Sequence, residues 1–211
     1  MSELTQALKR FSFWIENSQS SHAQIIKTNY PFRDEKHRKE WSPQPGLERE
    51  MIELYVEETN LELPEEIYEI YQWHNGKFEI GDYANPVYFP SFEEAFDCVF
   101  KWGFKKFPIF LGHRCHYAID PVKRGQQTSP IRYYESGIEQ NEDEIVYSVY
   151  APSLTNVMKA VAECAEKYDA ISIYYADFDS MPMKPRYSQS SLITQTYQKY
   201  GVVGRSCGLW R

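Results

Sequence analysis

The residues best suited to chemistry stand together in the sequence as His113-Arg114-Cys115-His116. Two imidazoles and a thiol are ligands that zinc accepts, and a thiol near a histidine can act as a hydrolase nucleophile. On a strand, His113 and Cys115 share one face and His116 points to the other. No paired motif elsewhere supplies the further ligands of a metal site. We therefore favour ordinary turn and strand residues, and keep a thiol- or metal-dependent hydrolase using Cys115 with His113 or His116 as the alternative.

Paired carboxylates are a second possible source of chemistry. Glu65/Glu66 and Glu93/Glu94 fall in the first turns of predicted helices, where negative charge complements the positive end of the helix dipole. This placement explains both pairs without acid–base catalysis. The sequence contains neither a glycine-rich phosphate-binding loop nor a Gly-x-Ser-x-Gly motif. We therefore predict no catalytic residue, no metal and no cofactor, and expect a protein that is not an enzyme.

The loop over residues 137–144 is strongly acidic. Such a loop is typically a solvated surface, but clustered charge also speeds the encounter with an oppositely charged protein. The turn at 112–116 is the second place where polar side chains gather beside predicted strands. Together these segments predict the partner-binding residues His113, Arg114, His116, Glu139, Glu142, Asp143 and Glu144.

The composition narrows the class of protein. The chain has 211 residues and a net charge of −7, and an acidic surface repels phosphate backbones. We expect no nucleic-acid partner and a protein partner that is basic. Apolar residues make up 42%, with 17 Tyr, 12 Phe and 5 Trp, which excludes an intrinsically disordered chain. So many aromatic residues exceed the needs of one interface, and most of them must form the core.

The compartment is predicted from targeting signals and cysteines. The N-terminal residues show no basic flank followed by an apolar run, and no stretch approaches the roughly 20 apolar residues that span a bilayer. The four scattered cysteines, Cys98, Cys115, Cys164 and Cys207, form no Cys-x-x-Cys pair. We expect reduced thiols that pack as small apolar side chains, in a cytoplasmic protein with no membrane partner.

Helices are predicted at the start of the chain. Apolar residues at helical spacing indicate a helix over 2–16, and a later helix shows Met51, Leu54 and Tyr55 on one face. Between them, residues 17–46 are polar and rich in proline, which indicates a linker or an extended arm.

The next helix has clear end signals. Pro64 suits its first turn, where the missing N–H has no intrahelical partner, and Asn75-Gly76 can adopt the left-handed conformation that stops a helix. Its predicted inner stripe consists of Ile67, Ile70, Tyr71 and His74.

Strands dominate the middle of the chain, and helices return after it. A hairpin is predicted at 78–89, strands at 107–111, 115–119, 131–134 and 146–150, and helices at 91–99, 153–165 and 192–200. Residues 169–177 fit a strand or a continued helix. This order predicts an α+β fold with a central, mostly antiparallel sheet flanked by helices, and with helical extensions at both ends.

An ordered set of motifs resembles the SUKH superfamily, the Smi–Knr family of fungal cell-wall regulators and bacterial toxin-immunity proteins. The motifs are Leu63-Pro64-Glu65-Glu66-Ile67 with Tyr71 and Asn75-Gly76, Ser91-Phe92-Glu93-Glu94-Ala95, Phe107-Pro108-Ile109 with Tyr117-Ala118-Ile119-Asp120, Ile131-Arg132-Tyr133-Tyr134, and Ala151-Pro152-Ser153-Leu154. The match covers roughly residues 45–168, and the agreement of all five in order makes it specific.

The resemblance implies an α+β binding module without a catalytic constellation. It divides the chain into an N-terminal helix and arm at 1–44, a SUKH-like domain at 45–170, and a C-terminal extension at 171–211. His113–His116 departs from the glycine- and aspartate-rich turn that is usual in the family. The implied function is a non-enzymatic protein of the immunity type or a cell-wall and proliferation regulator, acting by binding a protein partner.

Overall fold

An antiparallel sheet forms the centre of the computed structural model, whose strands run in the order of the sequence. The structure describes residues 1–27, 45–59, 61–82, 85–101, 104, 106–112, 115–120, 122, 125–135, 146–169, 171 and 190–203. The strands of this part are β1 (Phe78–Asp82), β2 (Asn85–Phe89), β3 (Phe107–Gly112), β4 (Cys115–Ile119), β5 (Ile131–Glu135) and β6 (Val146–Ala151). Each pairs antiparallel with the next, so the predicted hairpin at 78–89 and the four later strands are confirmed.

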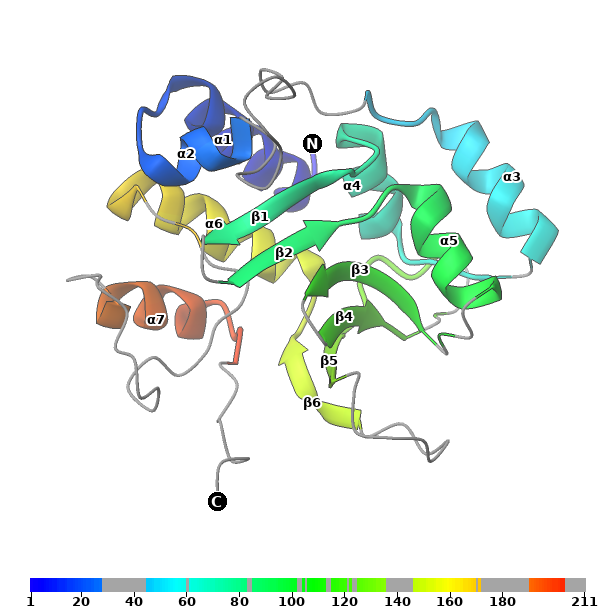
Figure 1. Cartoon of the computed structure of the whole chain (residues 1–211). Helices are drawn as coiled ribbons and strands as arrows, with labels where there is room; N and C mark the ends of the chain where they lie inside the picture. Colours follow the sequence, from blue (N-terminus) through cyan, green and yellow to red (C-terminus); the bar gives the residue numbers. More distant parts are fainter. Residues whose placement is uncertain are drawn as a thin grey trace.

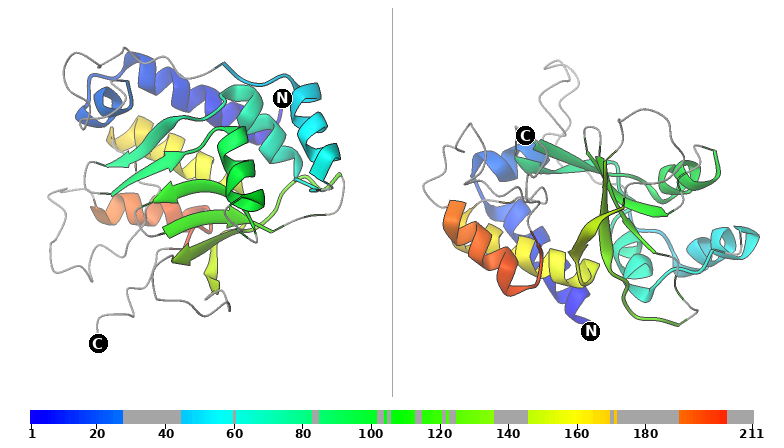
Figure 2. Two further views of the ribbon diagram at one scale, coloured as in Figure 1. Left: turned by 45° about the vertical axis from the view of Figure 1, so that its right-hand side comes forward. Right: turned by 90° about the horizontal axis from the view of Figure 1, so that it is seen from below.

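Helices flank the sheet on both sides (Figures 1 and 2). They are α1 (Glu3–Asn17), α2 (Ser21–Lys27), α3 (Arg49–Thr59), α4 (Glu65–Trp73), α5 (Phe92–Phe100), α6 (Leu154–Tyr168) and α7 (Ser190–Lys199). In the right-hand view of Figure 2, α1, α6 and α7 lie on one side of the strands, and α3 and α5 lie on the other. The predicted α+β fold with an antiparallel sheet and terminal helical extensions is confirmed.

Side-chain caps begin the helices where the sequence predicts them. Ser91 accepts a hydrogen bond from the backbone N–H of Glu94, whose carboxylate accepts one from the N–H of Ser91, and the two bonds form a capping box. Ser153 caps α6 in the same manner by accepting from the N–H of Asn156. The apolar residues Leu154, Val157, Met158, Val161 and Ala165 of this helix are all buried.

One continuous core joins the sheet to the N-terminal helix. Leu8, Phe11 and Ile15 of α1 are fully buried in the same cluster as the residues of the sheet and of α6. The indole N–H of Trp14 donates to Asp169, 2.7 Å away, at the end of α6. Helix α1 is therefore part of the folded body. Among the described residues, no helix has the length and the apolar character needed to cross a membrane.

Two local expectations are wrong, one for a linker and one for a helix end. Residues 21–27 form helix α2 where a polar linker or arm is predicted, because Ser20 caps the N–H of Ala23 and both Ala23 and Ile26 are buried. His74 is not on the inner stripe of a helix. Helix α4 ends at Trp73, and His74 is extended and forms an isolated bridge with Pro45. Residues 28–44, and 172–177 of the ambiguous segment, lie outside the described residues.

Candidate functional site

Of the seven predicted partner-binding residues, His116 alone lies within the described residues. Its ring stacks on Tyr134 of β5 at 4.9 Å with an interplanar angle of 5°, and it contacts Phe104 at 4.5 Å. Burial lowers the pKa of His116 to about 4, so the ring is neutral at pH 7. It acts as a cross-strand packing residue, because β4 and β5 place His116 opposite Tyr134.

The other candidates on this turn and on the acidic loop lie outside the described part of the chain, as does the side chain of Cys115. The hydrolase alternative therefore stays a prediction. Within the described part, no group of three or more His, Cys, Asp and Glu side chains is arranged to hold a metal ion.

Two cysteines behave as predicted. Cys98 and Cys164 are free and fully buried. Burial raises the pKa of the Cys98 thiol to about 11 and that of Cys164 to about 12. Both thiols are protonated at pH 7 and pack as small apolar groups, which confirms the expectation for these two positions.

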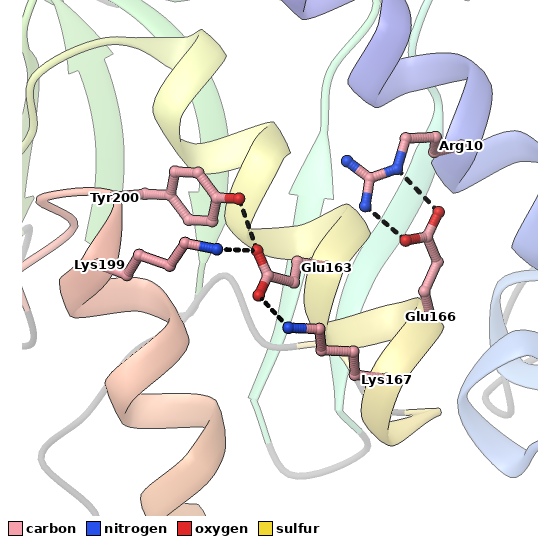
Figure 3. A network of polar contacts seen from close by, with 6 residues as sticks. All are labelled: Arg10, Glu163, Glu166, Lys167, Lys199 and Tyr200. Carbon is pink, nitrogen blue, oxygen red and sulfur yellow. Dashed lines mark hydrogen bonds and ion pairs between the residues drawn. The ribbon is translucent and has the colours of Figure 1, made fainter.

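A buried carboxylate on α6 holds the C-terminal helix in place (Figure 3). Glu163 is 6% exposed and accepts hydrogen bonds from Lys167 at 2.6 Å, Lys199 at 2.7 Å and the Tyr200 hydroxyl at 2.5 Å. Burial opposes ionisation, but these three donors outweigh it and lower the pKa of Glu163 to about 2. The network joins α7 to α6. Because its charged groups are hydrogen-bonded to one another, we assign it a structural role.

Replacing Glu163 with glutamine is expected to lower the free energy of unfolding by about 2 kcal/mol at pH 7, allowing for solvent screening around the exposed lysines. The carboxylate's pKa is lower in the folded state than its ordinary 4.5, so its contribution is complete above about pH 4.5 and disappears as the pH falls through about 2. Urea unfolding of both proteins across this range measures the difference, which should narrow towards low pH.

The matched control for this prediction is Glu166→Gln on the same helix. Glu166 pairs with Arg10, and both side chains are about 40% exposed. Exposed ion pairs contribute little, so this variant should lose at most about 1 kcal/mol. Equal losses in the two variants, or a Glu163→Gln difference that does not change with pH, would contradict the role given to the network.

Helix α3 presents an apolar surface to solvent. It lies at the outer edge of the molecule in both views of Figure 2, and Ile52 is its one fully buried residue. Met51 is 47% exposed and Leu54 is 54% exposed. Around the helix Met51 lies between Leu54 and Tyr55; Met51 and Leu54 face solvent, and Tyr55 is half-buried.

This surface continues onto α5. The ring of Tyr55 lies 5.4 Å from Phe96, and Phe96 stacks on Phe100 at 5.4 Å. Phe100 itself is 52% exposed. We call this surface the α3–α5 strip; it consists of the exposed Met51, Leu54 and Phe100, joined through the half-buried Tyr55 and the buried ring of Phe96.

Acidic side chains lie on the same two helices as the strip. Glu50 and Glu58 are exposed on α3, and Glu93 and Asp97 are half-buried on α5. Asp97 pairs with Lys101, 2.9 Å away, at the end of α5. Among the described residues, the two helices that carry the strip thus bear more acidic than basic side chains.

The opposite flank of α3 forms a cavity of about 360 Å³ with α4 and the chain between them. Arg49 closes one side, because its guanidinium donates to both oxygens of Glu65, at 2.8 and 2.9 Å, and to Glu53 at 2.8 Å. The same guanidinium lies 4.5 Å from the centre of the Tyr68 ring. These hydrogen bonds lower the pKa of Glu65, so its carboxylate is ionised at pH 7.

Sequence reasoning identifies neither flank of α3 as a site. The sequence feature that could have indicated these sites is the high density of acidic residues between Glu48 and Glu66, with short runs of apolar residues among them. A sequence window cannot show whether an apolar helix face is covered, because coverage depends on elements distant in the chain.

Comparison with protein-family models finds no match, and comparison with curated proteins finds none. The geometry around α3 therefore carries the argument about function.

Proposed function

We propose that the protein is a non-enzymatic binding module that acts in the cytoplasm by capturing a basic protein partner through the α3–α5 strip. The observation that carries this proposal is the exposure of Met51, Leu54 and Phe100 on two adjoining helices. The resemblance of the sequence to immunity and cell-wall regulatory proteins agrees with it. In this proposal the protein is of the immunity or regulatory type, and binding itself is its activity.

The chemistry of the strip favours a protein as the ligand. Exposed apolar residues that gather in one place mark interaction surfaces more often than isolated ones do. Aromatic residues and methionine are enriched at protein interfaces. The acidic residues of α3 and α5 and the net charge of −7 favour a partner with basic residues near its own apolar contact.

A capture experiment with surface variants tests the proposal. The double variant Leu54→Ser/Phe100→Ser removes the two most exposed side chains of the strip. Because both are solvent-exposed, the fold should be retained. Immobilised wild-type protein should retain a partner from host extract at low salt in a saturable manner, and the double variant should bind the purified partner at least about tenfold more weakly.

The control is Phe13→Ser on α1, which is 68% exposed and lies on the other side of the sheet from α3 and α5 (Figure 2). It removes an exposed aromatic ring without touching the strip, so its affinity should equal that of the wild type. A partner that binds the strip variant as tightly as the wild type would contradict the assignment of the surface. Absence of any saturable partner would contradict the function.

A further inference from the structure

We propose that the cavity between α3 and α4 binds a cationic side chain, arginine or lysine, supplied by the protein partner. This inference rests on the proposed function and adds a specific recognition site to it. The cavity volume, about 360 Å³, is at the lower end of the range for ligand pockets, which suits a single long side chain.

The lining of the cavity matches the two parts of such a side chain. Its apolar surface comes from Val56, Leu61, Leu63 and Tyr68, of which Leu63 and Tyr68 are buried. The aliphatic stem of an arginine or lysine packs well on a surface of this kind while its charged end stays near solvent. The Tyr68 ring already faces one guanidinium, that of Arg49.

The charges of the lining favour a cation. Among the described residues around the cavity, the carboxylates of Glu53, Glu57 and Glu65 stand against the guanidinium of Arg49. Both oxygens of Glu65 and one oxygen of Glu53 are already bonded to that guanidinium. An anion would meet a surplus of negative charge here, so Arg49 does not form an anion site.

Glu57 is the carboxylate best placed to receive the ligand. It is exposed at the rim, and no hydrogen bond or ion pair engages its side chain within the described part of the chain. It follows Glu53 by one helical turn on the same flank of α3, so the two carboxylates stand side by side at the opening. A guanidinium that enters along the apolar wall can reach both.

The cavity and the α3–α5 strip occupy opposite flanks of one helix. An α-helix with its side chains is only about 10–12 Å across, so a partner that covers α3 can contact both flanks. The strip would then supply apolar contact area, and the cavity would select a partner with a basic residue at one position.

The test uses nuclear magnetic resonance titration of the full-length, isotope-labelled protein with N-acetyl-arginine amide. Its matched probe is N-acetyl-citrulline amide, which has the same shape without the charge. The arginine probe should shift the amide signals of Glu57, Leu61 and Tyr68 in a saturable manner with a millimolar dissociation constant, and the citrulline probe should not. Glu53→Gln/Glu57→Gln should weaken binding at least about fivefold.

Glu16→Gln on α1 is the control, because this exposed residue does not line the cavity and its loss should leave the probe affinity unchanged. Equal shifts with citrulline, or no saturable shift, would overturn the inference. Lys123 and Arg124 precede the cavity residue Gly125 in the sequence and lie outside the described residues. If Lys123→Ala/Arg124→Ala binds the probe and the wild type does not, the chain fills its own cavity, which also overturns it.

These outcomes are separate from the outcome for the proposed function. The amino-acid probe reports on the cavity without any partner, whereas the strip variants report on partner capture. A cavity that fails to bind the probe leaves the strip result standing, and a strip that captures no partner leaves the probe result interpretable.

Discussion

Replacing Gly76 with alanine is expected to destabilise the fold by more than about 4 kcal/mol, enough to abolish a cooperative unfolding transition in a marginal protein. Gly76 has a φ of +61°, and a Cβ at this position would lie 2.0 Å from the carbonyl oxygen of Pro90 and 2.3 Å from its carbon. Both are backbone atoms, so no side chain can move aside. Urea unfolding followed by tryptophan fluorescence measures the loss.

Gly76 lies in the turn between α4 and β1, and this turn packs against the chain that enters α5. The side-chain oxygen of Asn75 accepts from the N–H of Phe92 at 2.8 Å, at the first turn of α5. The N–H of Lys77 donates to the carbonyl of Phe89 at 2.8 Å. These bonds fix the turn after α4 against the end of β2 and the start of α5, and we expect a side chain on Gly76 to break them.

Gly125→Ala separates the two causes of the expected loss of stability at Gly76, which are the positive φ and the clash of a Cβ with Pro90. Gly125 also has a positive φ, +81°, but a Cβ there would meet no atom within 4 Å. Alanine at this position should lower the free energy of unfolding by only about 1–2 kcal/mol, the penalty for a left-handed backbone conformation. Similar losses at Gly76 and Gly125 would show that the contact with Pro90 is relieved by movement, contrary to the expectation.

Local signals predict most of the fold. Ser91 and Ser153 cap helices at the predicted residues because their hydroxyls bond to backbone within the same turn, and such contacts are fully encoded nearby in sequence. Alternating and helical patterns likewise locate the strands and α6. Helix α2 escapes prediction because it is only seven residues long, and two buried residues, Ala23 and Ile26, stabilise it through the core instead of through a long periodic pattern.

The candidate site is less predictable for a physical reason. Met51 and Leu54 have the spacing of core residues. In the folded protein α5 packs on Tyr55 but leaves Met51 and Leu54 exposed to solvent. His116 illustrates the reverse case. Its polar side chain suggests a contact residue, yet Phe104 and Tyr134 surround it. In both cases the distinction depends on elements that meet only after folding.

Replacing Glu66 with alanine is the second large effect, an expected loss of about 4 kcal/mol in the free energy of unfolding. The Glu66 side chain is 2% exposed. It belongs to α4, but it also accepts hydrogen bonds from α6. One oxygen accepts from the N–H of Ser129 at 3.0 Å, and the other from the N–H and hydroxyl of Thr155 at 3.1 and 3.2 Å. Alanine would leave these buried donors without an acceptor.

Glu66→Gln distinguishes hydrogen bonding from simple packing. Glutamine preserves the shape, but its amide has one acceptor oxygen, so in either orientation its NH₂ group faces a backbone N–H, of Ser129 or of Thr155. We expect it to lose about half as much stability as alanine, while exposed Glu16→Gln loses almost nothing. If Glu66→Gln were as stable as the wild type, the carboxylate would not be the acceptor that joins α4, the 125–130 segment and α6. The loss would then come from packing alone.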